Sequence, residues 1–302
     1  MERDLKTVVF SPDIPPEQQI QKEAFQHFVA YMNEMADRIG MKKSHFHDAA
    51  GMDNLTTARD LLHLMAYAVK NPVLQKIWNQ NQHTVTVEGN TPRTQLCQSK
   101  SRHSDLDDAY RVVGRKGGSL RSSRCNLYVY NLATILEIPN SPDLLAVVVM
   151  YAPDDNESPN NRFRATRQVA DIAIARYEDP NADISRMPVC CENAIAAVLP
   201  ADGSAARILY EKDADAQGRP MSISKVLTAV CVLEQVKDLA EKITYDVFDT
   251  NIGGFYARDF LPGDEMTYLD AMYALMLESS NVTAQALARL VDSVQIFGHI
   301  FF

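Results

Sequence analysis

An uninterrupted apolar run from Leu144 to Ala152 sets the strongest limit on how this chain folds. A helix that spans a membrane needs about 20 apolar residues, and this run is far shorter than that. An apolar run of strand length that is rich in valine is instead typical of a strand buried on both faces of a sheet. We therefore expect a globular core built around this buried strand, and no membrane-spanning segment in this chain.

Further segments with strand or helix character surround this run. Alternation or β-forming residues predict strands over 83–88, 126–132, 194–199 and 206–211, the last two joined by a turn at 200–203. Helical periodicity predicts helices over 23–39, 57–69, 164–176, 222–236, 268–277 and 281–290. Nothing repeats with a period of about 20 to 50 residues, so the two halves of the chain are not copies of each other.

Composition excludes several classes of function. The formal net charge is −9 and no long basic block occurs, so the chain has no electrostatic footprint for nucleic acid. The chain lacks C-x-x-C, H-E-x-x-H and the glycine motifs that bind nucleotides, which predicts neither a metal nor a cofactor. His45 and His47 have no third ligand nearby and are expected in a surface loop. The first thirty residues lack the positive and apolar regions of a signal peptide, so we expect no export signal in this segment.

The tetrapeptide Ser222-Ile-Ser-Lys225 could carry nucleophilic chemistry at the start of a predicted helix. Three residues are nearly one helical turn, so the hydroxyl and the amine share a face, and the amine can take the proton as the hydroxyl attacks a carbonyl. Free N–H groups at the helix start suit the oxyanion that forms. Taken alone, however, this common pattern favours an N-cap serine followed by an exposed lysine.

Two other patterns could support the same chemistry. Ser279 and Asn281 follow the end of a predicted helix, where a hydroxyl and an amide could relay a proton and hold a substrate amide. Lys116-Gly-Gly-Ser119 precedes a β-rich run, where a positive charge and an exposed strand edge could hold a substrate carboxylate. Each also has a simpler interpretation, as a helix-end turn and as a turn with a solvated lysine.

Together, the three patterns resemble the S-x-x-K, S-x-N and K-[TS]-G signatures of penicillin-binding proteins and serine β-lactamases. The flanking residues are similar to those of the low-molecular-mass D-alanyl-D-alanine carboxypeptidases in segments 28–61, 208–214, 219–225, 261–264 and 273–281. The resemblance extends over most of the chain. It implies an α+β fold of the β-lactamase/transpeptidase type, in which an antiparallel sheet is flanked by helices and joined by a helical lobe.

The resemblance also implies an activity and a set of site residues. The implied enzyme is a serine-type D-Ala-D-Ala carboxypeptidase that acts on peptidoglycan stem peptides through an acyl-enzyme on Ser222, with β-lactam antibiotics as covalent inhibitors. The implied catalytic residues are Ser222, Lys225 and Ser279. The implied substrate-binding residues are Asn281, Lys116, Gly117, Gly118 and Ser119. The family works outside the cytoplasm, in the cell envelope or as secreted enzymes, which implies an extracytoplasmic location.

The order of the segments differs from that of the family. The family's chain runs from S-x-x-K through S-x-N to K-[TS]-G, whereas here the Lys116 element comes first. Segments 20–176 and 190–302, joined by a linker at 177–189, together have the length of one domain. Two arrangements fit: a single circularly permuted domain over 1–302, or the end of one tandem copy joined to the start of the next. Residues 294–302 match no part of the family's pattern.

One residue departs from the family at the site itself. Gly117 stands where the family has threonine or serine, so a hydroxyl for the substrate carboxylate is missing unless Ser119 replaces it. We therefore expect Gly117→Thr to raise activity. An impaired penicillin-binding-like protein or a tandem-gene fragment is the alternative function. A β-lactamase is less favoured because no E-x-x-L-N segment occurs where that class needs it.

Overall fold

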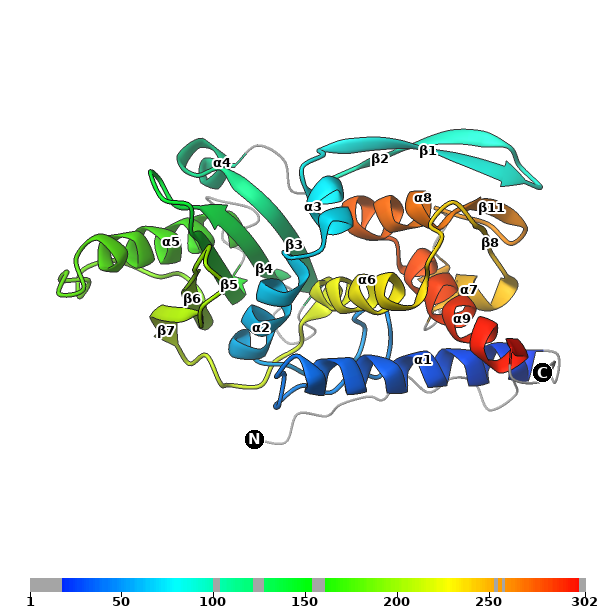
Figure 1. The fold of residues 1–302 in the computed structure, drawn as a ribbon, viewed down its shortest axis with the longest axis horizontal. Helices are drawn as coiled ribbons and strands as arrows, with labels where there is room; N and C mark the ends of the chain where they lie inside the picture. Colours follow the sequence, from blue (N-terminus) through cyan, green and yellow to red (C-terminus); the bar gives the residue numbers. More distant parts are fainter. Residues whose placement is uncertain are drawn as a thin grey trace.

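A computed structural model describes residues 18–99, 104–121, 128–153, 161–252, 255–256 and 259–298. Its central element is a five-stranded antiparallel sheet with the strand order β3-β4-β5-β6-β7 (Figure 1). The strands are β3 (Val112–Arg121), β4 (Tyr128–Glu137), β5 (Leu144–Pro153), β6 (Asn193–Leu199) and β7 (Arg207–Lys212). The predicted hairpin is β6–β7 beside the apolar strand β5, whereas β3, which contains Lys116, forms the opposite edge.

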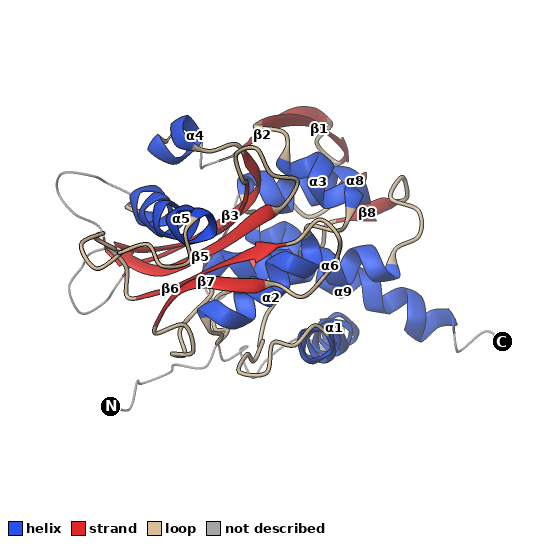
Figure 2. Ribbon diagram, turned by 60° about the vertical axis from the view of Figure 1, so that its left-hand side comes forward, coloured by secondary structure: helices blue, strands red, loops and turns tan. Residues whose placement is uncertain are grey.

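The apolar run in β5 is buried because both faces of the sheet are covered. The side chains of Ala146, Val148 and Met150 belong to a core that includes α2 (Ala58–Ala68) and α6 (Ser224–Gln235). The odd-numbered side chains of 145–149 belong to a second core formed mainly with α5 (Arg162–Glu178). Figure 2 shows α5 on one side of the sheet and α2 and α6 on the other. A strand that packs on both sides needs an apolar residue at every position, which is what the sequence contains.

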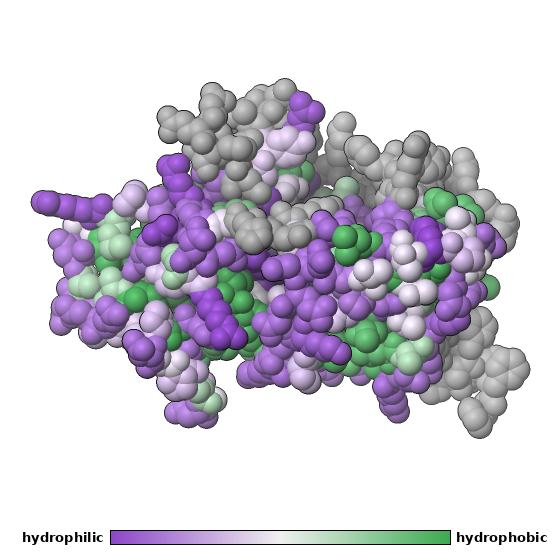
Figure 3. All heavy atoms as spheres, turned by 90° about the horizontal axis from the view of Figure 1, so that it is seen from above, coloured by the Kyte–Doolittle hydropathy of each residue, from purple (hydrophilic) through white to green (hydrophobic). Residues whose placement is uncertain are grey.

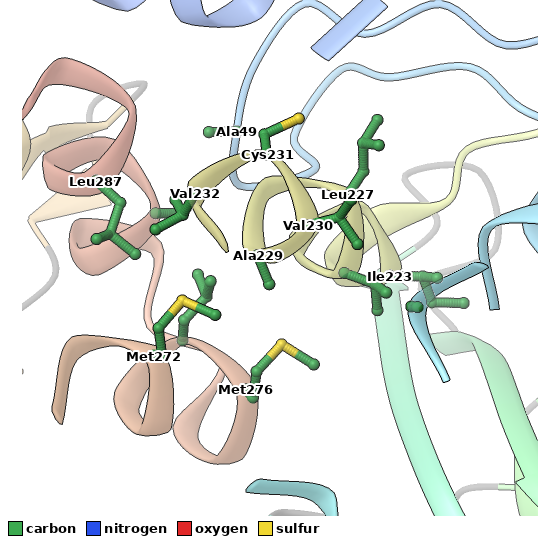
Figure 4. Packing of buried hydrophobic residues seen from close by; sticks show 14 of the residues in the cluster. Ala49, Ile223, Leu227, Ala229, Val230, Cys231, Val232, Met272, Met276 and Leu287 are labelled. Atoms are coloured by element: carbon green, nitrogen blue, oxygen red, sulfur yellow. The ribbon is translucent and has the colours of Figure 1, made fainter. Parts of the chain in front are cut away.

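A helical lobe surrounds α6 at one end of the sheet. Every residue of α6 from Ser224 to Val232 is buried, as expected for a helix whose apolar residues point in all directions. Its neighbours include α1 (Gln19–Arg38), the turn 274–278 that follows α8 (Tyr268–Tyr273), and α9 (Asn281–Gly298). Figure 4 shows side chains of α6 among those of Met272, Met276 and Leu287. This packing fixes the helix that follows Ser222.

A smaller antiparallel sheet covers the helical lobe, with the strand order β2-β1-β11-β8. Its strands are β1 (Gln82–Gly89), β2 (Arg93–Gln98), β8 (Lys242–Thr244) and β11 (Asp264–Thr267). β8 and β11 are only three and four residues long and β2 is mostly polar, so only β1 is predicted by the sequence. The remaining elements are α3 (Pro72–Trp78), α4 (Asp105–Ala109), α7 (Val247–Thr250), β9 (Asn251–Ile252) and β10 (Phe255–Tyr256).

Asn71-Pro72 illustrates why α3 is absent from the sequence prediction. The pair ends α2 as predicted, but the Asn71 side chain also accepts hydrogen bonds from Val73 N and Leu74 N and begins the next helix. Proline is favoured at the first position of a helix because its missing N–H is not needed there. The same dipeptide is therefore both a stop and a start.

The two segments 20–176 and 190–302 both contribute strands to the central sheet. Strand β5 pairs with β6 from Leu144 opposite Leu199 to Met150 opposite Asn193. The expected linker, 177–189, contains the end of α5 but otherwise no helix or strand. Figure 3 shows a mainly hydrophilic face on which apolar residues form small separate areas. Among the helices that the structure describes, none is both long and apolar enough to cross a bilayer. The predicted α+β fold is confirmed.

Candidate active site

Ser222 lies in a 3₁₀ turn, Met221–Ile223, that leads directly into α6. Met221 has a φ of 55°, a left-handed conformation that is strained for this residue type. Two glycines allow other segments to approach the turn. A Cβ on Gly51 would lie 1.9 Å from Met221 O, and a Cβ on Gly118 would lie 2.8 Å from Met221 Cβ. The close approach of both segments holds the Ser222 turn in place.

Lys225 is completely buried one turn beyond Ser222. Its Nζ donates hydrogen bonds to Ala50 O at 2.7 Å and to Asn281 Oδ1 at 2.6 Å, and it lies 3.1 Å from Ser222 Oγ. The Ser222 side chain therefore contacts the lysine and makes no helix-capping bond. The simpler interpretation, an N-cap serine beside an exposed lysine, is wrong because α6 is buried on all sides.

Ser279 and Asn281 lie where a π-helical turn, Ala274–Glu278, meets α9. Ser279 has a φ of 61°, and the left-handed conformation at this position reverses the chain direction. Ser280, between them, is buried and its hydroxyl accepts a hydrogen bond from Thr283 N. Asn281 is thereby directed to Lys225, while Ser279 Oγ accepts a hydrogen bond from Lys116 Nζ at 2.9 Å.

The Lys116–Ser119 segment forms the part of edge strand β3 that faces the cluster. The Lys116 side chain is 5% exposed, and besides Ser279 its Nζ bonds Gly117 O at 3.0 Å. Successive side chains of a strand point to opposite faces, so Lys116 and Gly118 face the Ser222 turn, and Gly117 and Ser119 face away from it. All of the residues that the sequence predicted for the site nevertheless line one cavity, except Lys225, which contacts Ser222 and Asn281 beside it.

Arg162, at the first position of α5, occupies the space beside Gly117. A Cβ on Gly117 would lie 2.2 Å from Arg162 Nη1. Arg162 Nη2 donates to Ser119 Oγ at 2.6 Å, Nη1 donates to Asn131 O at 3.3 Å, and the guanidinium lies 4.7 Å from the centre of the Tyr130 ring. Burial lowers the pKa of Arg162 to about 10, which leaves the group charged at neutral pH. The charged guanidinium of Arg162 therefore occupies the space that a side chain at position 117 would fill.

These residues line a cavity of about 490 Å³ that opens beside Ser222. Among the described residues, its lining includes three basic side chains, Arg115, Lys116 and Arg162, and no acidic one. The rest of the lining includes Ser99, Tyr128, Tyr130 and Met276. A cavity with this charge suits a substrate that carries a carboxylate close to the group attacked by Ser222.

Two features of the site were not predicted from the sequence. Arg162 follows an acidic loop and has no neighbouring motif, so only the packing of α5 against the sheet places it in the cavity. The carbonyl of Ala50 is a main-chain group, and its residue type carries no signal for lysine binding. Gly51, between Asp48 and Asp53, is the only hint in the sequence of an unusual backbone there.

Comparison with known families gives the class of protein to which this fold belongs. The family model described as D-alanyl-D-alanine carboxypeptidase matches residues 23–131 and 188–295. These segments make up well over half of the chain, so the protein belongs to the D-alanyl-D-alanine carboxypeptidase family. Neither curated proteins nor solved structures give a match to this chain.

Family membership confirms the resemblance inferred from the three motifs and their flanks. The family consists of peptidases, which are hydrolases, that act on peptidoglycan peptides, bind β-lactams and are generally found outside the cytoplasm. The match falls in two segments that are separated by residues 132–187.

Proposed function

We propose that this protein is a serine-type D-Ala-D-Ala carboxypeptidase that cleaves peptidoglycan stem peptides through an acyl-enzyme on Ser222. The observation that carries the proposal is the 3.1 Å separation between Ser222 Oγ and Lys225 Nζ, with the amine also bound to Ala50 O and Asn281 Oδ1. A neutral amine has two protons and one lone pair. The two oxygen acceptors take both protons, which leaves the lone pair for the Ser222 hydroxyl.

In the acylation step, Ser222 Oγ bonds to the carbonyl carbon of the penultimate D-Ala while its proton passes to Lys225 Nζ. The N–H groups of Ser222 and Ser119 are the proposed oxyanion donors. The C–N bond then breaks, and the departing amine takes the proton that Lys225 Nζ had accepted, with Ser279 Oγ, held 2.9 Å from Lys116 Nζ, as the proposed relay. Water subsequently bonds to the ester carbonyl carbon while one of its protons passes to Lys225 Nζ. The C–Oγ bond then breaks, the shortened peptide leaves, and Lys225 returns the proton to Ser222 Oγ.

Recognition of the terminal carboxylate is assigned to the basic side of the cavity. Lys116 and Arg162 supply positive charge, and Ser119 is held by Arg162. A planar guanidinium can donate two parallel hydrogen bonds to a carboxylate. Arg162 thus offers a substitute for the hydroxyl that Gly117 lacks, which favours an active enzyme over the alternative of an impaired penicillin-binding-like protein.

We further propose that residues 1–302 form one domain in permuted order, and that it works outside the cytoplasm as the family generally does. The support for one domain is that each part supplies groups that the other lacks. Ser222, Lys225, Ser279 and Asn281 come from the second part, whereas Lys116 and the Ala50 carbonyl come from the first. The pairing of β5 with β6 across 177–189 supports the same proposal.

Labelling with a fluorescent penicillin tests the proposed function, because covalent capture requires the whole site. We expect the purified protein to be labelled and mass spectrometry to place the adduct on Ser222. Ser222→Ala should abolish labelling and change the free energy of unfolding by less than about 1 kcal/mol, since the hydroxyl caps no helix. A wild-type protein that is folded but unlabelled, and that releases no D-Ala from a stem peptide, would support the impaired alternative.

A further inference from the structure

A buried carboxylate, Asp48, lies at the centre of the loop that approaches Lys225. Only 9% of Asp48 is exposed. Its two oxygens accept hydrogen bonds from four consecutive backbone N–H groups, those of Ala50, Gly51, Met52 and Asp53, at distances of 2.6 to 3.1 Å. A carboxylate bound by several N–H groups fixes the orientation of each peptide unit that donates to it.

Two of these peptide units also have their carbonyls bound to α6. In a planar trans peptide the N–H and the C=O point in opposite directions. Gly51 N donates to Asp48 Oδ1 at 2.6 Å, and the carbonyl of that same unit, Ala50 O, accepts from Lys225 Nζ at 2.7 Å. The preceding unit repeats the arrangement, because Ala50 N donates to Asp48 and Ala49 O accepts from Thr228 Oγ1 at 2.7 Å.

The orientation of the Ala50 carbonyl matters because it is one of the two oxygens that direct the Lys225 amine. Rotation of this peptide unit would release one N–H of the amine, and the lone pair would no longer be aimed at Ser222 Oγ. Gly51, whose φ is +92°, has no side chain to limit such a rotation, so hydrogen bonds within the loop fix the orientation of its peptide units. Asp48 supplies most of these bonds from within the loop.

We propose that Asp48 is a positioning residue that aims the Ala50 carbonyl, and through it the Lys225 amine, at Ser222. Asp48 touches neither the substrate nor the reacting atoms. The inference rests on the proposed function for its effect on rate, but its effect on Lys225 is a property of the folded protein alone.

The kinetic test separates the acylation step from binding. Penicillin acylation of wild type, Asp48→Asn and Asp48→Ala is followed by stopped flow, which gives the binding constant of the noncovalent complex and the rate constant of acylation. Misplacing a catalytic group costs about a hundred-fold, so we expect this loss of rate in Asp48→Ala. Asp48→Asn, which keeps the shape but loses one acceptor, should lose about ten-fold. The binding constant should stay within about two-fold, because the cationic side of the cavity is untouched.

Asp60→Asn is the matched control. Asp60 is also a buried carboxylate, 4% exposed, and it accepts hydrogen bonds from Lys43 N and Ser44 Oγ. Its loss should lower the melting temperature and leave the acylation rate constant unchanged. Equal acylation rates in wild type and both Asp48 variants, or an equal fall in Asp60→Asn, would overturn the proposal. If the Asp48 variants do not fold, Thr228→Val releases the Ala49 carbonyl from α6 and should slow acylation in the same direction.

A spectroscopic measurement makes the inference independent of catalysis. The side-chain nitrogen signal of Lys225 is identified in ¹⁵N-lysine-labelled protein by its absence in Lys225→Ala. In Asp48→Asn we expect this signal to move and its protons to exchange faster with water, with no such change in Asp60→Asn. An unmoved signal overturns the positioning role even if wild type is active. A moved signal in a protein that penicillin does not label supports the positioning role and contradicts the proposed function.

Discussion

The two lysines of the site, Lys225 and Lys116, have different surroundings. Lys225 is completely buried in α6, and two oxygens from distant parts of the chain direct its amine. Lys116 projects from the edge strand β3 and lines the cavity. Lys225 does not line it. The difference suggests how one side-chain type can serve two tasks. A base must be held behind the hydroxyl it deprotonates, whereas an anchor must face the incoming charge.

Lys225→Ala should give the largest effect and the clearest contrast. General bases contribute about a hundred- to ten-thousand-fold to rate, and no second amine lies within one helical turn of Ser222 in α6. We expect acylation by penicillin and release of D-Ala to fall by that factor together. The measurement is single-turnover acylation of the variant beside wild type. Acylation that survives within about ten-fold would assign the base to another group.

Lys116→Ala should instead weaken mainly the recognition of the terminal carboxylate of the substrate. Losing a hydrogen bond to a charged group costs about 1.5 to 3 kcal/mol, or roughly ten- to a hundred-fold in kcat/KM. We expect this loss for a stem peptide with a free terminal carboxylate and a smaller loss for the same peptide as a terminal amide. Lys225→Ala provides the control, since it should slow both peptides by the same factor. Equal losses for both peptides in Lys116→Ala would remove the contrast between the two lysines.

The sequence predicts the Ser222–Lys225 pair better than it predicts the groups that surround the pair. The spacing of Ser222 and Lys225, together with the family resemblance, predicts that the pair shares a helix face, and the apolar run in β5 predicts a buried strand. The resemblance also predicts Asn281, but the Ala50 carbonyl could not be predicted, because it belongs to the main chain of a loop that is far from Lys225 in sequence. Arg162 was also missed, since its place beside Gly117 follows from how α5 crosses the sheet.

Position 117 shows how such a missed neighbour changes a prediction. From the sequence alone, restoring threonine at this position should raise activity, because the family's hydroxyl is absent. In the structure, a Cβ at 117 would lie 2.2 Å from Arg162 Nη1, so the guanidinium must move. Its bonds to Ser119 Oγ and Asn131 O would then be strained or lost. Because of the position of Arg162, we now expect the opposite direction of effect for Gly117→Thr.

Gly117→Thr should have the smallest effect of the three variants, and it should be a loss. The new hydroxyl can replace part of the carboxylate binding that is lost when the Arg162 guanidinium is displaced. We therefore expect kcat/KM for the free-carboxylate peptide to fall by less than about ten-fold. Gly117→Ala, which adds the Cβ without the hydroxyl, should fall further. In an Arg162→Ala background the space is empty, and there Gly117→Thr should raise kcat/KM instead. A gain from Gly117→Thr with Arg162 present would mean that the guanidinium moves freely and that the cavity tolerates both groups. A change of sign between the two backgrounds would establish that arginine and threonine compete for one place in the site.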